Sequence, residues 1–366
     1  MGPTDPTTPL DGPAVVHCAG AFSTTYGKTA HGLVRRTRRY RVMAVIDPEL
    51  AGRDAGEFLD GRANGIPLVP DLDSALAAAA EAGFPARYFV IGIAPDGGRL
   101  DSGLRAAVHG AISAGLNVDS GLHDFLGEDP EFVSLAEEKG VSLRDVRKTP
   151  PRSALHAFTG RVEEVDSLRV AILGTDSAIG KRTTAWELVA GLESAGIGAE
   201  MVGTGQTAWL QGARYSLMLD SLVNDFIAGE IEHAVWSAWK EMGPEVIVVE
   251  GQGSLMNPAY PGGFEILAAA RPHCVILQHA PARELYDGFP DYPLHPIATQ
   301  IQAIELLSGH PVVAVTINHE NLDPAATRAA ARKIEEETGL PAVDVLLDGA
   351  DRLVEVIRAQ MGRLKT

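Results

Sequence analysis

The stretch LGTDSAIGKRTTAW, residues 173–186, decides the fold. It follows the β-branched run 169–173 and precedes apolar residues that recur at helical spacing from Ala185 to Leu192, with Gly196 ending the pattern. A strand, a glycine-rich loop and a helix in this order bind phosphate, because the N–H groups and the dipole at the helix start attract anions. The expected contacts are Gly174, Thr175, Asp176, Ser177, Ala178, Ile179, Gly180, Lys181, Arg182, Thr183 and Thr184.

The loop departs from the usual template at the residue after its lysine. In G-x-x-x-x-G-K-[ST] a hydroxyl there holds magnesium, but here the residue is Arg182. Five residues, not four, separate Gly174 from Gly180. The first hydroxyl after the lysine is that of Thr183, which lies one residue beyond the metal-binding position and so is turned about 100° around the helix axis from it. We therefore expect no metal, and a pyrophosphate such as that of coenzyme A suits the loop better than a magnesium nucleotide.

Strands alternate with helices on both sides of this stretch, which predicts parallel sheets. The expected strands are 41–46, 66–69, 87–94 and 116–118 in the first half, and 169–173, 200–202, 246–249, 274–277, 312–316 and 342–347 in the second. The expected fold is α/β, with an N-terminal Rossmann-like parallel-sheet domain (15–148) followed by a P-loop NTPase-like α/β domain (169–366). Residues 1–14 are expected to form a disordered tail and 149–168 a linker.

Composition restricts the partners. The 366 residues include 48 acidic and 31 basic side chains, a net charge of −17 that repels nucleic acid and anionic membranes. No apolar run approaches the roughly 18 residues of a membrane span. Two cysteines and the lack of a signal peptide favour the cytoplasm. We expect a small-molecule partner, no nucleic acid and no membrane, and a homodimer as the assembly that apolar helices allow.

The carboxyl ends of the strands carry the candidate catalytic residues. Glu250 follows the strand 246–249 and is interpreted as a general base or a holder of water, although pairing with Lys181 or Arg182 is the alternative. Gln206 lies among glycines and hydroxyls after 200–202. It is interpreted as a group that polarises a carbonyl, or as part of a turn only.

Six further residues are expected to bind substrate. The segment 251–262 offers hydrogen-bond donors and wall residues, and Arg283 follows the strand 274–277, where it can bind a carboxylate or pair with a neighbouring acid. The expected substrate contacts are Thr207, Ser254, Asn257, Tyr260, His279 and Arg283. A second Gly-Lys-Thr at 27–29 does not fit the template, because Gly20 is too far from it.

Four segments together resemble a known family: 120–126 (SGLHDFL), 174–184, 203–210 (GTGQTAWL) and 248–262 (VVEGQGSLMNPAYPG). They resemble the P-loop family that includes D-glutamate N-acetyltransferase, and the likeness runs from about Val15 to His319. That family also places a non-hydroxyl residue after the loop lysine. The resemblance implies acetyl-CoA as acyl donor and an acidic amino acid as acceptor. A histidine commonly stands in that family where this chain has Asn257, which puts the substrate in question.

Three functions follow as hypotheses. In the first, an acetyl-CoA-dependent N-acyltransferase uses Glu250 as base and Gln206 or backbone N–H groups to hold the oxyanion, acting on a small acidic amino acid such as D-glutamate. The second is an ATP- and magnesium-dependent ligase or kinase resembling dethiobiotin synthetase, with Thr183 or Asp176 replacing the missing metal ligand. The third is a non-catalytic nucleotide sensor.

Overall fold

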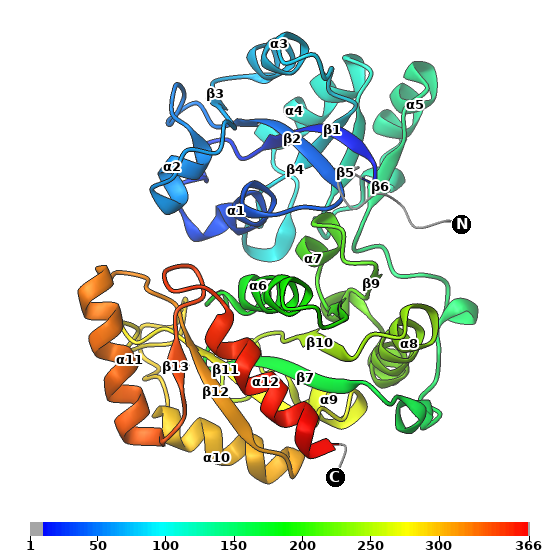
Figure 1. The fold of residues 1–366 in the computed structure, drawn as a ribbon. Coiled ribbons are helices and arrows are strands. Elements are labelled where there is room, and N and C mark those ends of the chain that lie inside the picture. The colour runs from blue at the N-terminus through cyan, green and yellow to red at the C-terminus, as the bar shows by residue number, and fades with distance from the viewer. Residues whose placement is uncertain (1–9, 365–366) are drawn as a thin grey trace. The chain divides into compact units, whose positions relative to one another are not determined.

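The computed structural model describes residues 10–364, which divide into two compact units (Figure 1). The first unit contains residues 10–149 together with the short segment Gln206–Ala213. The second unit contains Pro150–Gly205 and the remainder from Arg214 onward. Each unit is built on its own parallel sheet.

Within the described residues, the first unit has a six-stranded sheet in the order β3-β2-β1-β4-β5-β6. The strands are β1 (Gly12–His17), β2 (Tyr40–Ile46), β3 (Leu68–Val69), β4 (Tyr88–Ile91), β5 (Asn117–Ser120) and β6 (Leu143–Asp145). The helices are α1 (Lys28–Arg35), α2 (Ala55–Asp60), α3 (Leu72–Glu81), α4 (Ser102–Ser113) and α5 (Pro130–Lys139). This strand order is that of the Rossmann fold, so the predicted fold class is confirmed.

Strand β1 corrects the prediction for the N-terminus. It begins at Gly12, inside the stretch 1–14 for which a disordered tail was expected, and it pairs with both β2 and β4. Ala14, Val15 and Val16 are fully buried. The strand is short and follows a proline-rich polar stretch, so periodicity gave little signal there. Residues 1–9 lie outside the described part of the chain.

The second unit has a seven-stranded sheet in the order β13-β12-β11-β7-β10-β8-β9, counted over the described residues. The strands are β7 (Leu168–Gly174), β8 (Ala199–Gly203), β9 (Tyr215–Ser216), β10 (Val246–Glu250), β11 (Cys274–His279), β12 (Val312–Ile317) and β13 (Ala342–Val343). The helices are α6 (Lys181–Ser194), α7 (Gln206–Leu210, assigned to the first unit), α8 (Asn224–Met242), α9 (Phe264–Ala269), α10 (Ile297–Ser308), α11 (Pro324–Thr338) and α12 (Asp351–Leu364).

Strand β13 is shorter than the predicted strand 342–347. The carboxylate of Asp344 accepts the backbone N–H groups of Leu346 at 2.9 Å and Leu347 at 3.2 Å, and this turn ends the strand after Val343. Short 3-10 helices complete the chain: η1 (Thr25–Gly27), η2 (Asp96–Gly98), η3 (Leu126–Glu128), η4 (Arg152–Ala154), η5 (Arg161–Glu164) and η6 (Leu219–Ser221).

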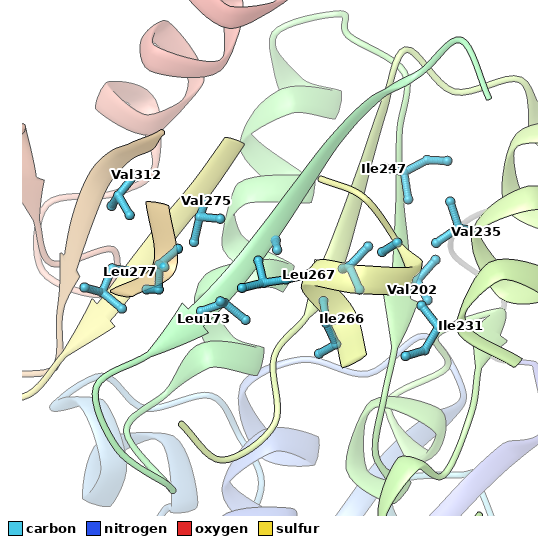
Figure 2. Close-up of a cluster of buried hydrophobic side chains, with 14 of the residues drawn as sticks. Leu173, Val202, Ile231, Val235, Ile247, Ile266, Leu267, Val275, Leu277 and Val312 are labelled. Carbon is cyan, nitrogen blue, oxygen red and sulfur yellow. The ribbon is translucent and has the colours of Figure 1, made fainter. Parts of the chain in front are cut away.

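The core of the second unit fixes the strands that carry the site. Leu173 of β7 and Leu277 of β11 are paired in register and buried. Figure 2 shows them with Ile266 and Leu267 of α9 in one apolar cluster. Gly191 on α6 packs against Ala350 and against Val354 of α12. A Cβ at Gly191 would lie 3.0 Å from a side-chain atom of each, so glycine allows α6 and α12 to approach this closely.

The expected linker is part of the second unit. The backbone and side chain of Thr159 both donate to a carboxylate oxygen of Glu232 on α8, at 2.7 and 2.8 Å. The backbone of His156 donates to Glu230 at 2.6 Å. The segment 150–168 therefore packs on α8, and the boundary between the units falls after Thr149.

The segment Gln206–Ala213 leaves the second unit after β8 and packs into the first. Leu210 is fully buried in the apolar core there. The guanidinium of Arg39 lies 3.7 Å from the centre of the Trp209 ring and donates to the Trp209 carbonyl at 2.8 Å. The chain therefore crosses between the units three times, at 149/150, 205/206 and 213/214. No sequence pattern predicted this exchange.

Candidate functional site

The phosphate-binding loop forms as predicted, between the end of β7 at Gly174 and the start of α6 at Lys181. Gly180 has φ +101°, and Ala178 has φ +50°, a left-handed conformation that costs an L-residue about 1–2 kcal/mol. A Cβ at Gly174 would lie 2.9 Å from Nζ of Lys181. The loop is thus wrapped tightly around its lysine, at the start of a helix, where backbone N–H groups without helical partners attract anions.

Gln278, at the end of β11, lies beside the start of α6. Its side-chain carbonyl accepts two hydroxyl hydrogen bonds, from Thr184 at 2.5 Å and from Thr316 at 2.6 Å. These two hydrogen bonds fix the orientation of the amide, so its NH₂ group faces Gly180. Nε2 lies 3.8 Å from the point that a Cβ on Gly180 would occupy. Gln278 therefore presents an N–H donor to the helix start.

Lys181 and Arg182 bring positive charge next to a buried carboxylate. Nζ of Lys181 donates to the carbonyl of Asp176 at 2.6 Å. Glu250, at the end of β10, is 5% exposed and accepts the backbone N–H of Thr204 at 2.9 Å. Burial raises the pKa of Glu250, and the charges of Arg182 and Lys181 with the N–H of Thr204 oppose that rise. Glu250 is thus a buried acid close to both cationic side chains.

Asp176 anchors two further loops to the phosphate-binding loop. Its buried carboxylate accepts hydrogen bonds from Nδ2 of Asn257 at 2.8 Å, from Arg283 at 2.9 Å and from the backbone of Asp287 at 2.9 Å. Arg283 also donates to the carbonyl of Ser177 at 2.9 Å and to Glu320 at 2.8 Å. Asn257 and Arg283, expected to bind substrate, hold the loop in this structure.

The donor set does not fit a magnesium ion at the usual place. Arg182 stands where the metal-binding hydroxyl would be. Asp176 is already bound by Asn257 and Arg283. Arg182 therefore places a positive charge, and no hydroxyl ligand, at the usual metal position.

The remaining residues of the second unit are placed as follows. Nδ1 of His279 lies 2.9 Å from the hydroxyl of Thr175, and burial lowers the pKa of His279 to about 4, so the imidazole is neutral at pH 7. Ser254 is 2% exposed, and its hydroxyl has no hydrogen-bond partner among the described residues. Tyr260 is 55% exposed. Ile179 is fully buried and Thr183 is half-buried.

Gln206 and Thr207 belong to the first unit. The hydroxyl of Thr207 lies 2.8 Å from that of Thr29, and both are buried. A Cβ at Gly121 would lie 2.7 Å from Cγ of Gln206. The segments 27–29, 120–126 and 206–210 thus meet within this unit, including the Gly-Lys-Thr that the sequence template did not fit.

Sequence reasoning missed three polar residues around the phosphate-binding loop: Gln278, Thr316 and Asn318. The side chain of Asn318 donates to the carbonyl of Ile179 at 3.0 Å and holds the loop near Gly180. All three lie at or beyond the ends of neighbouring parallel strands. The strand-end rule pointed to these positions, but it does not say which polar residue faces the loop.

Comparison with known proteins places the chain in a family. A model described as a domain of unknown function, DUF1611 C-terminal P-loop domain, matches residues 156–354. The model for the DUF1611 N-terminal Rossmann-like domain matches residues 48–149. The chain belongs to the DUF1611 family.

Named and solved relatives of this DUF1611 protein match most of its length. It is 30% identical over 288 residues to a protein of Tritonibacter scottomollicae named D-glutamate N-acetyltransferase, covering 75% of this chain and 82% of the relative. A protein of a Pseudoalteromonas species with the same name is 30% identical over 280 residues, covering 74% and 80%. The crystal structure of a DUF1611 family protein from Anabaena variabilis superposes with a TM-score of 0.86 at 29% identity, over 95% of this chain and 99% of that one.

Proposed function

We propose that the chain is an acetyl-CoA-dependent N-acetyltransferase that acts on the amino group of a small acidic amino acid such as D-glutamate. The names of two relatives at 30% identity support an acetyltransferase role. The observation that carries the proposal is the phosphate-binding loop with Arg182 in place of the metal-binding hydroxyl, next to the buried acid Glu250. Such a loop suits a diphosphate ester that is not itself cleaved.

In this proposal the diphosphate of acetyl-CoA lies at the start of α6. The chain offers it backbone N–H groups, the charges of Lys181 and Arg182, and the amide N–H of Gln278. In a protein with a net charge of −17, these local donors offset the repulsion that an anionic ligand would meet. Arg182 supplies the positive charge that a magnesium ion supplies in nucleotide-cleaving loops.

Glu250 is the proposed general base. A buried carboxyl with a raised pKa is better matched to proton transfer near neutrality than an exposed one. Glu250 takes one proton from the ammonium group, and the neutral amine nitrogen then forms a bond to the thioester carbonyl carbon while the carbon–sulfur bond breaks. The sulfur leaves as a thiolate and takes up the second proton that the nitrogen loses, so the products are the N-acetyl amino acid, the free thiol and a protonated Glu250, which releases its proton to water.

The ligase or kinase alternative requires a metal ligand in place of the missing hydroxyl. Asp176 was one candidate, and its carboxylate is bound by Asn257, Arg283 and the backbone of Asp287. Its use as a metal ligand would require these loops to separate. The other candidate, Thr183, is half-buried on the first turn of α6, and the magnesium dependence of ATP binding tests its use as a ligand.

The proposal is tested by incubating the protein with acetyl-CoA and a panel of D- and L-amino acids while free thiol is measured. We expect thiol release with an acidic amino acid, and loss of that release in the Glu250→Gln variant. The control is Glu265→Gln, which removes a carboxylate from α9 outside the proposed site. If the wild-type protein releases no thiol with any acidic amino acid of either configuration, the proposal is contradicted.

A further inference from the structure

A cavity of about 370 Å³ lies in the second unit between the loops that follow β10 and β11. Met256 and Pro258 line it from the first loop, and Tyr286, Tyr292, Leu294 and His295 line it from the second, with two further prolines. The lining residues are not part of the phosphate-binding loop, and no role has been given above to the cavity itself.

The cavity is joined to the phosphate-binding loop by short stretches of chain. Asn257, between Met256 and Pro258, donates to Asp176 at 2.8 Å. Asp287, next to Tyr286, donates its backbone N–H to the same carboxylate at 2.9 Å. Both walls are therefore anchored on Asp176 of the phosphate-binding loop.

The second wall is a preformed structure. The backbone of Tyr286 donates to the carbonyl of Tyr292 at 3.0 Å, and Leu294 donates to Glu284 at 2.8 Å, which makes a short hairpin. The hydroxyl of Tyr286 lies 2.8 Å from Nδ1 of His295, which positions both rings in the wall. The cavity therefore presents mainly apolar side-chain faces to a ligand.

The lining offers no ion pair to a charged occupant. Over the described residues that form the cavity there is no lysine, arginine, aspartate or glutamate. Arg283, close in sequence, is paired with Asp176 and Glu320. Several lining residues are exposed, so polar parts of a ligand can keep contact with water while its carbon chain packs on the aromatic and aliphatic side chains. The lining therefore favours a neutral occupant, attached to a group that binds the phosphate-binding loop.

We propose that this cavity binds the acyl-pantetheine arm of coenzyme A, the neutral chain that links the diphosphate to the thioester. The inference rests on the proposed function. The nucleotide end of the same molecule carries a 3′-phosphate, which this lining cannot compensate. The loop that supplies Met256 and Pro258 also begins directly after Glu250, so one segment connects the general base with the wall of the cavity.

The test compares two ligands that differ only in this arm. Calorimetric titrations use coenzyme A and 3′-phosphoadenosine 5′-diphosphate with the wild-type protein and with Leu294→Asp, which puts a carboxylate in the cavity. The matched control is Leu306→Asp on α10, a position 85% exposed and outside the cavity. We expect Leu294→Asp to weaken coenzyme A about tenfold or more and to change the arm-less nucleotide by less than about twofold.

Tyr292→Ala, at a residue 53% exposed, serves as the second variant if Leu294→Asp does not fold. If the variant loses affinity for both ligands equally, the inference is overturned, because the cavity would then contact the nucleotide end. Unchanged coenzyme A affinity in both variants also overturns it, while the proposed function stands. If the wild-type protein binds no coenzyme A, the proposed function fails and the inference falls with it.

Discussion

The guanidinium of Arg283 donates to the carboxylate of Asp176 at 2.9 Å, with side chains that are 9% and 0% exposed. The pair joins the loop after β11 to the phosphate-binding loop after β7. The same carboxylate also accepts from Asn257 and from the backbone of Asp287. A buried carboxylate held in this way makes the shape of the phosphate-binding loop depend on a residue that is distant in sequence.

Replacing Arg283 by methionine should destabilise the protein by about 3–5 kcal/mol, because the carboxylate of Asp176 would stay buried after losing this ion pair. Urea unfolding of the variant measures this. The control is Arg99→Met, which removes the exposed Arg99–Asp124 pair, with side chains 79% and 35% exposed. That change should cost less than about 1 kcal/mol. Similar costs for the two variants would show that Asp176 is not buried as described.

Arg182→Ser restores the usual template at the position after the lysine. We expect its affinity for coenzyme A to fall about tenfold or more, because a charge next to the diphosphate is lost. Magnesium-dependent ATP binding should strengthen, since the new hydroxyl can hold the ion. Calorimetry with each ligand checks both effects, and Arg152→Ser on η4 is the control for loss of an exposed positive charge. Wild-type affinity for coenzyme A in Arg182→Ser would refute the role given to Arg182.

Gln278→Glu separates the two faces of the Gln278 amide. The new carboxylate can still accept from Thr184 and Thr316, but it places an oxygen where Nε2 faces Gly180. Coenzyme A binding should weaken about tenfold or more, and the melting temperature should also fall because the new carboxylate is buried. Thr316→Val, which removes one hydroxyl but leaves the amide, should weaken binding much less. If Thr316→Val has the larger effect, the amide does not contact the ligand.

The pH dependence of catalysis and of stability should reflect the ionisation of Glu250. Its pKa is raised above the ordinary 4.5 by burial, so kcat/KM should fall as the pH drops through that raised pKa. The same shift favours the protonated acid in the fold, so its contribution to stability is present at low pH and is lost as the pH rises through the folded-state pKa. The Glu250→Gln variant should therefore gain in melting temperature relative to wild type as the pH rises. If the difference in melting temperature between Glu250→Gln and wild type instead shrinks as the pH rises, the pKa of Glu250 is not raised in the folded protein.

Leu210→Ala tests the exchange of Gln206–Ala213 into the first unit. Leu210 is fully buried in the core of that unit, so the substitution should cost about 2–5 kcal/mol in chemical unfolding. Leu306→Ala, at an 85% exposed position, should stay within about 0.5 kcal/mol of wild type. A cost for Leu210→Ala that is no larger than the control would show that the segment does not pack as described.

The sequence predicted the sheets and the phosphate-binding loop because their signals are local. The buried strand at 169–173, the glycines at 174 and 180 and the helical spacing after Lys181 all act within a few residues. The clamp on Asp176 could not be predicted, because Asn257 and Arg283 reach it from more than 80 residues away in sequence. Gln206 illustrates the opposite error, since its neighbours in sequence suggested the second unit while its packing lies in the first.

The central claim is that the loop at 174–184 grips the diphosphate of coenzyme A with N–H groups and cationic side chains, with no divalent ion. Calorimetric titration of the wild-type protein with coenzyme A and with ATP, each in magnesium and in EDTA, tests it most directly. The account predicts that coenzyme A binds equally well in both buffers and more tightly than ATP. Magnesium-dependent binding of ATP together with no binding of coenzyme A would contradict it.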